Sequence, residues 1–277
     1  MRFALVTDVH FGPAAYFEGR LRKLSHEAGR LLGGFVERMN QSVRPDLVVN
    51  LGDAIEDEST AADRDRYTEF LSVLSRLQAP LLHVAGNHDS VHLDDAALGA
   101  LWQHQGPLYY SRDVGGVHFV VLRTEETKDV AVHLAAEQID WLAADLAGAA
   151  LPAIVLTHHP ASDQSLEGNR WFEKAPHICR IAERKELRAA IAASGKVLGV
   201  FNGHAHWNHV DVIAGIPYIT LQSLVENLDE DAPGRAAAAY AVCDVDDRNL
   251  HVHIGGEHEL RLEFQRGRPA GARSAGD

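Results

Sequence analysis

Several features that would assign a protein to a class at once are missing from this sequence. Its 277 residues include two cysteines, Cys179 and Cys243, which lie far apart and form no CxxC pair. The sequence therefore indicates neither a disulfide framework nor a thiolate metal site, and we expect both thiols to be reduced and buried. No apolar run approaches the roughly 20 residues of a membrane span, and the run over residues 1–6 is too short for a signal peptide. These absences predict a soluble, cytoplasmic protein.

Positive charge is scarce as well. The chain has 26 lysine and arginine residues against 39 aspartate and glutamate residues, a formal net charge of −13. Binding to nucleic acid or to an anionic membrane requires concentrated Lys and Arg, so we expect neither as a partner. An acidic substrate would have to be attracted locally, for example by metal ions. Histidine is the residue in excess, with 17 copies, several at the ends of apolar runs. The oligomeric state is left open, a homo-oligomer included.

The first half of the chain alternates expected strands and helices. Buried strands are predicted at 3–6, 47–49 and 81–85, and apolar residues at helical spacing predict helices over 21–39 and 67–77. In the second half, Gly115-Gly116 predicts the turn of a β-hairpin. The hairpin strands are expected at 109–114 and 117–122, further helices at 135–146 and 181–193, and further strands at 153–156, 197–201, 210–213, 218–221, 241–245 and 250–254.

These elements predict one α/β domain over residues 1–265. A βαβ-type first half and a more antiparallel second half would pack as two sheets with helices outside. Residues 266–277 are rich in Gly, Ala and Arg, and we expect them to form a disordered tail. No internal repeat and no linker divides the sequence.

Five of the expected strands end in side chains that bind metal ions. Each of these residues has a structural explanation when taken alone, such as a turn cap or a hydrogen bond to a carbonyl. Turns favour Gly, Asn, Asp, Ser and Pro, however, and not histidine. Because open α/β sheets hold ligands at the carboxyl ends of their strands, the pattern predicts one shared site. Its residues are Asp8, His10, Asp53, Asn87, His88, His158, His204 and His206.

The order of these segments resembles the five-block signature of the calcineurin-like metallophosphoesterases. The blocks are Asp8-Val9-His10, Gly52-Asp53, Gly86-Asn87-His88-Asp89, His158 and Gly203-His204-Ala205-His206, and the resemblance covers roughly residues 1 to 225. It is closest to the small bacterial members related to class III cyclic-nucleotide phosphodiesterases. The resemblance implies a four-layer α/β/β/α sandwich of two mixed sheets flanked by helices, with a dinuclear metal centre.

The resemblance also implies a role for each residue. Asp53 would bridge two metal ions, and His88 would face the scissile phosphate without binding metal. Asp8, His10 and His206 would hold the first ion, and Asn87, His158 and His204 the second. Oxygen and imidazole ligands suit transition metals, so we expect two ions of Mn, Fe or Zn per chain. A metal-bound hydroxide would attack phosphorus while His88 supplies a proton or hydrogen bond to the leaving oxygen.

We therefore expect a phosphodiesterase that hydrolyses small, cyclic nucleotide-like phosphodiesters. A phosphomonoesterase, or a diphosphatase that cleaves a nucleotide-diphosphate compound, would use the same centre. A non-catalytic scaffold of the same fold is the alternative from another class, and the complete set of ligands argues against it. The expected partner is a small phosphate-ester substrate.

The roles of the residues around the centre stay open at this point. Arg170 could hold a phosphate and Trp171 or Phe172 could stack on a base, although packing of the loop explains these aromatic residues equally well. Asp89 could orient His88 or close the turn. His159 is expected to face solvent from a loop in preference to a supporting hydrogen bond near the centre. Arg123 stands where relatives often carry Asp, which puts the corresponding contact in doubt.

Overall fold

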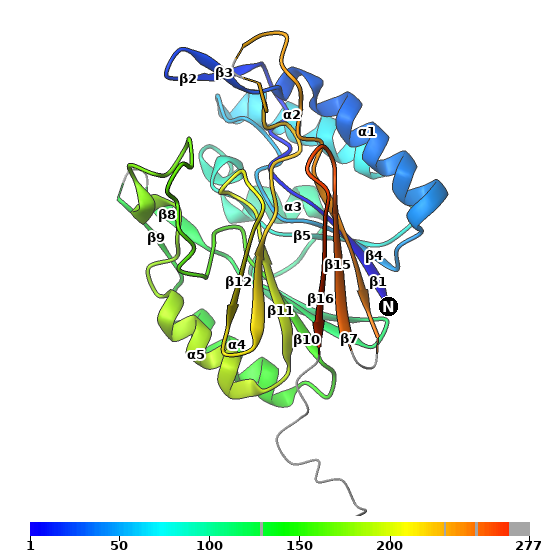
Figure 1. Cartoon of the computed structure of the whole chain (residues 1–277), viewed down its shortest axis with the longest axis vertical. Helices are drawn as coiled ribbons and strands as arrows, with labels where there is room; N and C mark the ends of the chain where they lie inside the picture. Colours follow the sequence, from blue (N-terminus) through cyan, green and yellow to red (C-terminus); the bar gives the residue numbers. More distant parts are fainter. Residues whose placement is uncertain (128–129, 230, 247–248, 266–277) are drawn as a thin grey trace, which may run out of the picture.

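Two sheets packed face to face, with helices on both outer faces, make up the protein (Figure 1). The computed structural model describes the chain except for residues 128–129, 230, 247–248 and 266–277. The tail expected over 266–277 lies outside the described residues. The predicted α/β/β/α sandwich is confirmed.

The first sheet has the N-terminal strand near its centre. Its strands are β1 (Arg2–Val6), β4 (Leu47–Asn50), β5 (Leu81–His83), β14 (Tyr240–Val245), β15 (Asn249–Gly255) and β16 (Leu260–Gln265). They lie in the order β16-β15-β14-β1-β4-β5. β1, β4 and β5 run parallel, whereas β14, β15 and β16 add to β1 in antiparallel fashion. The sheet is therefore mixed, and only β16 was not predicted.

The second sheet is also mixed. Its strands are β6 (Tyr110–Val114), β7 (Val117–Val121), β10 (Ala153–Leu156), β11 (Val197–Asn202), β12 (His209–Ile213) and β13 (Ile216–Thr220), in the order β12-β13-β11-β10-β7-β6. β6 and β7 form the predicted hairpin, in which Gly115 and Gly116 adopt φ angles of 57° and 83°. Positive φ at both turn residues matches the twist of paired strands, so this pair of glycines fits the turn.

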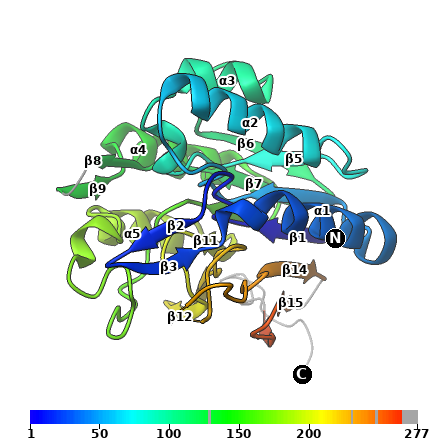
Figure 2. The same cartoon turned by 90° about the horizontal axis from the view of Figure 1, so that it is seen from above.

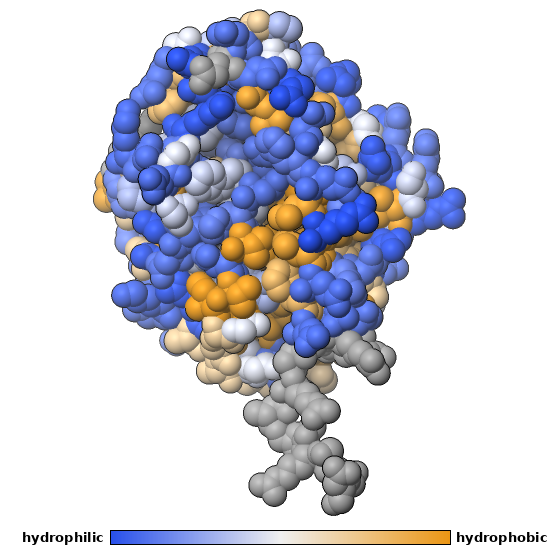
Figure 3. Space-filling view, in the orientation of Figure 1, coloured by the Kyte–Doolittle hydropathy of each residue, from blue (hydrophilic) through white to orange (hydrophobic). Residues whose placement is uncertain are grey.

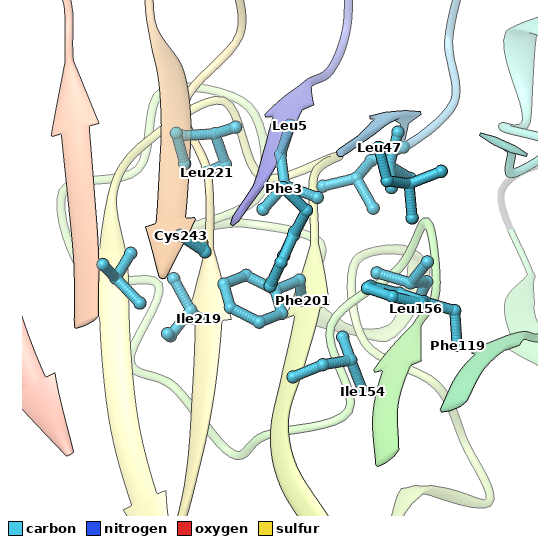
Figure 4. Packing of buried hydrophobic residues seen from close by; sticks show 14 of the residues in the cluster. Phe3, Leu5, Leu47, Phe119, Ile154, Leu156, Phe201, Ile219, Leu221 and Cys243 are labelled. Carbon is cyan, nitrogen blue, oxygen red and sulfur yellow. The ribbon is translucent and has the colours of Figure 1, made fainter. Parts of the chain in front are cut away.

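Alternation along the strands separates an inner core from two outer cores. In β1, Phe3 and Leu5 face the second sheet, while Ala4 and Val6 face the helices. Phe3 meets Phe119 and Phe201 edge-on, with ring centroids 5.3 and 5.7 Å apart. Figure 4 shows this inner core, with Phe3 beside Phe201. Such edge-on aromatic contacts stabilise the packing of one sheet on the other.

Helices cover the two outer faces separately. The first sheet packs against α1 (Ala28–Arg38), α2 (Thr60–Leu74) and α3 (Asp95–Trp102). The second sheet packs against α4 (Ala136–Gly148) and α5 (Arg184–Ser194). Among the described residues, none of these helices is long and apolar enough to cross a membrane. Cys179 and Cys243 are free and buried, as predicted.

The helix predicted from residue 21 begins only at Ala28. Residues before it form a hairpin of β2 (Ala15–Phe17) and β3 (Arg20–Lys23), in which Tyr16 pairs with Leu21. Leu21 and Leu24 are both buried and three residues apart, a spacing that fits a helix as well as this turn of the chain. Gly19, at a φ of 75°, closes the hairpin. Figure 2 shows β2 and β3 overlying the end of β11 in the view from above.

A second small hairpin, also not predicted, joins β8 (Glu125–Thr127) and β9 (Ala131–His133). Elsewhere on the surface, apolar side chains gather over β12 on the face seen in Figure 3. Val212 of this strand is 59% exposed. β12 is the edge strand of its sheet, so one side of its backbone has no neighbouring strand.

His118 fastens the β6–β7 hairpin to α4. Its Nδ1 lies 2.6 Å from Asp113 Oδ1 and its Nε2 lies 2.7 Å from Asp145 Oδ2, so both ring nitrogens face carboxylates. Burial lowers the pKa of His118, but the two carboxylates outweigh it and raise that pKa above its ordinary value. The imidazolium form is the one that donates to both carboxylates at once.

We expect His118→Gln to destabilise the fold in a pH-dependent manner. Because the folded-state pKa of His118 is raised, its contribution is complete below an unfolded-state pKa of about 6.5 and is lost as pH rises through the folded value. Urea denaturation at pH 6 should show a loss of roughly 1–3 kcal/mol in the free energy of unfolding, and a smaller loss at pH 9. His133→Gln, at an exposed single contact with Glu183, is the control. Equal losses at both pH values would contradict this account.

Candidate metal centre

All the residues predicted at strand ends lie in one place. β1, β4, β5, β10 and β11 end at the same side of the sandwich, and the loop after each strand carries one part of the set. Four groups of three residues each offer ligand atoms that lie within 4.8 Å of one another, and in three of these groups every residue is buried. The structure brings together Asp8, His10, Asp53, Asn87, His88, His158, His204 and His206.

Several residues of this centre have left-handed backbone conformations. The non-glycine residues with φ between 46° and 65° here are Asp8, His10, Asp53, His204 and His206. Such values cost about 1–2 kcal/mol for an L-residue outside special contexts. A Cβ on Gly86 would fall on the Asp53 carboxylate, and one on Gly203 would fall on Asp8 and Thr7. The glycines in the predicted blocks therefore permit close approach of strand ends.

The first ligand set consists of Asp8, His10 and His206. The Nε2 atoms of the two histidines lie 3.1 Å apart, and Asp8 Oδ1 lies 3.3 Å from His206 Nε2. All three side chains are buried. Three converging donor atoms, one of them anionic, form a pocket that a small cation would complete.

The second predicted ligand set is Asn87, His158 and His204. His158 Nε2 lies 3.1 Å from Asn87 Oδ1 and 3.3 Å from Asp53 Oδ2. His204 donates Nε2–H to the Ile178 carbonyl at 3.1 Å, which leaves its Nδ1 as the nitrogen able to bind a metal ion. Asp53 Oδ2 also lies 3.8 Å from His10 Nε2. Asp53 thus stands between the two sets, as a bridging carboxylate must.

The carboxylates of the centre are held in the ionised form. Burial by itself would raise the pKa of Asp53, but the neighbouring imidazoles of His158 and His88 lower it well below its ordinary value. For Asp8, His206 overcomes the same effect of burial and lowers the pKa. The donors in the two sets are carboxylate, amide and imidazole groups, and the described residues of the sets include no thiolate. Such donors fit divalent transition metals.

His88 lies beside the two sets and bonds to different partners. Its Nδ1 lies 2.5 Å from Asp57 Oδ1, and its ring meets that of His10 edge-on at 4.8 Å. Burial lowers the pKa of His88, while Asp53 and Asp57 raise it, and the net shift is upward. A cavity of about 580 Å³ borders His88, Asn87 and Asp57. The side chain therefore lies between Asp57 and an open space next to the sets.

Further acidic side chains, not predicted from the sequence, orient the ligand histidines. Glu226 Oε2 lies 2.7 Å from His206 Nδ1, and Glu56 Oε2 lies 3.0 Å from His10 Nδ1. Lys23 from the β2–β3 hairpin lies 2.5 Å from the same Glu56 oxygen. His158 instead donates Nδ1–H to the Leu51 carbonyl at 2.8 Å. The first set is thus supported by carboxylates and the second by backbone carbonyls.

Asp89 closes the turn after β5. Its carboxylate accepts hydrogen bonds from the backbone amides of Gly86 and Ala54 at 2.8 Å and of Asp53 at 3.0 Å. The imidazole of His88 has Asp57 as its carboxylate partner. Of the two alternatives for Asp89, the structure therefore supports the turn.

The expectation that His159 faces solvent is wrong. His159 is fully buried, its Nδ1 lies 2.8 Å from Thr124 Oγ1, and its ring lies 4.1 Å from that of His204. The backbone amide of Ile181 donates to the Pro160 carbonyl, so a distant segment covers this loop. Arg123 contacts Asp95 at 3.1 Å and Ser90 at 3.0 Å, linking the end of β7 to α3.

The aromatic residues of the 169–172 loop pack onto the ligand histidines. The Trp171 ring lies 5.2 Å from that of His206, and the Phe172 ring lies 4.6 Å from that of His204. Trp171 also donates Nε1–H to the Glu226 carboxylate. Arg170 is exposed, and its Nη1 donates to the Asn227 carbonyl at 3.3 Å. The loop therefore lies directly beside both sets.

Comparison with known proteins gives consistent matches. The profile of a family described as calcineurin-like phosphoesterase matches residues 1–208. A cAMP/cGMP dual specificity phosphodiesterase of Mycobacterium tuberculosis is 30% identical over 203 residues, which cover 69% of this chain and 58% of that protein. A 3',5'-cyclic adenosine monophosphate phosphodiesterase of Pseudomonas aeruginosa is 30% identical over 161 residues, 57% of this chain and 55% of that protein.

These curated relatives are matched over little more than half of their length. Among solved structures, a dimetal phosphatase from Danio rerio superimposes with a TM-score of 0.77 at 18% identity, covering 96% of this chain and 99% of that one. This likeness shows that the two chains share a fold.

Proposed function

The chain belongs to the calcineurin-like phosphoesterase family, and on that premise we propose that it is a metal-dependent phosphodiesterase acting on small phosphodiesters. The observation that supports the proposal is the convergence of the two predicted ligand sets on Asp53, with His88 beside them. Cyclic nucleotides are the first substrates to test, because curated relatives carry that activity in their names.

Two metal ions fit the donor atoms of the centre. The first ligand set would hold one ion and the second ligand set the other, with Asp53 shared between them. When bound, such a pair supplies Lewis-acid stabilisation of phosphate charge and activation of water. The anionic donors and their buried surroundings select for a cation here. Bound cations would in turn attract a phosphate that the net charge of −13 would otherwise repel.

His88 would act on the leaving group. Asp57 binds Nδ1 of His88, which fixes the ring and leaves Nε2 as the atom able to donate a proton. The backbone amide of His88 donates to Asp53 Oδ1 at 2.9 Å, so the residue is tied to the shared carboxylate without being part of either set. A proton donor placed in this way promotes departure of an alkoxide from phosphorus.

Metal analysis and hydrolysis of bis(p-nitrophenyl) phosphate test the proposal. The purified protein is expected to bind up to two transition-metal ions per chain, to lose hydrolysis on chelation, and to recover it when Mn, Fe or Zn is returned. A protein that binds none of these ions and shows no hydrolysis after they are added would be a scaffold of the same fold.

Glu226→Gln is expected to weaken metal binding at one position only. The substitution keeps the size of the buried side chain but removes the charge that faces His206 Nδ1, and loss of such a support typically costs about 10- to 100-fold in metal affinity. Titration with Co²⁺, followed by its visible absorption, separates the two binding steps. Glu263→Gln, an exposed glutamate, is the control. Equal weakening of both binding steps would contradict the view that Glu226 supports the first set through His206.

A further inference from the structure

Lys23 is a buried cation beside the first ligand set. It is the last residue of β3 and is 3% exposed. Its Nζ lies 2.5 Å from Glu56 Oε2, 3.4 Å from His10 Nδ1 and 5.4 Å from the centre of the Trp171 ring. Lysine is almost never buried to this extent unless its charge is paired. The carboxylate and the two rings therefore hold one positive charge directly behind a ligand histidine.

Backbone contacts anchor both members of the ion pair between Lys23 and Glu56. Lys23 forms an antiparallel bridge with Glu226, and the amide of Glu56 donates to the Phe11 carbonyl at 3.1 Å. A Cβ on Gly12 would lie 2.8 Å from the Cβ of Glu56, so glycine at this position permits the close approach of the two segments. Each residue is thus held at the position from which its side chain reaches the other.

Negative charge is concentrated around the first ligand set. Carboxylates in the set or next to it belong to Asp8, Asp53, Glu56 and Glu226. Asp8, Asp53 and Glu226 are at most 5% exposed, and charge without compensation at such depth is costly. Imidazoles compensate it only when protonated, and they must lose that proton before they bind a metal ion. The ammonium of Lys23 keeps its charge in both situations.

We propose that Lys23 is a built-in counter-charge of the first metal position, which stabilises the centre when no ion is bound and weakens binding of the ion held by the first ligand set. The inference rests on the proposed function, because it takes that set as a metal site. The ammonium of Lys23 repels a cation across the His10 ring and offsets the charge of Glu56, which supports this ring. One charge therefore lowers metal affinity through two effects.

Co²⁺ titration and urea denaturation of Lys23→Met test this proposal. Methionine keeps a long apolar side chain and removes the charge. One Co²⁺ binding step, the one that Glu226→Gln weakens, is expected to become about tenfold tighter, while the other changes by less than about twofold. The urea midpoint measured with a chelator present is expected to fall, because Glu56 loses its partner. A lysine that only anchors the hairpin predicts lower stability together with unchanged or weaker metal binding.

Glu56→Gln and the double variant separate the charge of Lys23 from its packing. Glu56→Gln should weaken the same binding step by about 10- to 100-fold, because His10 loses its support and the ammonium is left unpaired. Addition of Lys23→Met to Glu56→Gln should recover part of that affinity and raise the urea midpoint, since no unpaired charge remains. This comparison holds even where Lys23→Met alone does not fold, and equal affinities in the two variants would overturn the proposal.

Lys174→Gln is the matched control, because it removes a lysine that is 86% exposed and pairs with Glu18 of the same hairpin. It should leave both binding steps and the urea midpoint unchanged. Co²⁺ binding that is unchanged or weaker in folded Lys23→Met, or a urea midpoint that does not fall, would refute the role of Lys23 while leaving the metal centre in place. A protein that binds no transition metal would refute the proposed function itself.

Discussion

Asp53→Asn is expected to lose metal from both positions and to reduce hydrolysis by more than about 1000-fold. Asp53 stands between the two ligand sets, so its charge is the one that both cations would share. Two divalent ions about 3.5–4 Å apart repel each other unless an anionic ligand lies between them. Loss of the charge should therefore weaken both sites together, in contrast to the effect of Glu226→Gln.

The fold should survive this substitution. Asparagine tolerates the left-handed φ of 52° at this position and keeps an oxygen that can accept the backbone amide of His88. Elemental analysis after gel filtration measures the metal content, and thermal unfolding in the presence of a chelator checks the fold. Asp211→Asn, on β12, serves as the control. Full occupancy of both positions in Asp53→Asn would refute the shared role of this carboxylate.

His88→Asn is expected to reduce turnover of alkyl phosphodiesters by about 10²- to 10⁴-fold, the range for loss of a general acid. The protein should retain both metals, because His88 lies outside both ligand sets and has Asp57 as its partner. The effect should be much smaller for bis(p-nitrophenyl) phosphate, since p-nitrophenolate is a stable anion that leaves without a proton.

Comparison of an alkyl with an aryl diester therefore separates proton donation from metal binding. The measurement is kcat for both substrates, together with metal content, in His88→Asn and in the unmodified protein. A similar loss of kcat for both substrates would assign His88 to positioning of the phosphate. Loss of metal from His88→Asn would show instead that His88 is a ligand.

The residues of the two ligand sets could be found from the sequence because each follows a strand directly. His204 and His206, for example, come two and four residues after Asn202, the last residue of β11. Parallel strands end at one edge, so the fold collects what their ends carry. Local pattern and topology are sufficient for this part of the site.

The side chains that support the sets could not be found in this way. Glu226 reaches His206 because its segment pairs with Lys23, which is about two hundred residues earlier in the chain. Asp57 belongs to an acidic run, Glu56-Asp57-Glu58, in which one member turns to His88 and another to His10. No local signal distinguishes these acids, because their partners are chosen by tertiary packing.

His159 and the start of α1 illustrate the same limit for burial and boundaries. A histidine directly after a strand is typical of a loop, whereas His159 is buried beside Thr124 and His204, which come from other segments of the chain. Leu21 and Leu24 are buried in the structure, yet Leu21 lies in strand β3 of a hairpin and Leu24 directly follows that strand, before the first helix begins. Apolar spacing predicts that a residue is inside more securely than it predicts the element that carries it.

The left-handed backbone at the centre has a consequence for how such a protein would change once its chemistry were no longer needed. Asp8, His10, Asp53, His204 and His206 all have positive φ, and replacement of such a residue by glycine relieves about 1 kcal/mol of strain. Because glycine also raises the conformational entropy of the unfolded chain by a similar free energy, a duplicated copy without selection for activity would tolerate these replacements at little net cost in backbone free energy. Descendants that had become scaffolds should therefore carry glycine or asparagine at these positions while keeping the core around Phe3, so that inactive relatives are recognisable from sequence.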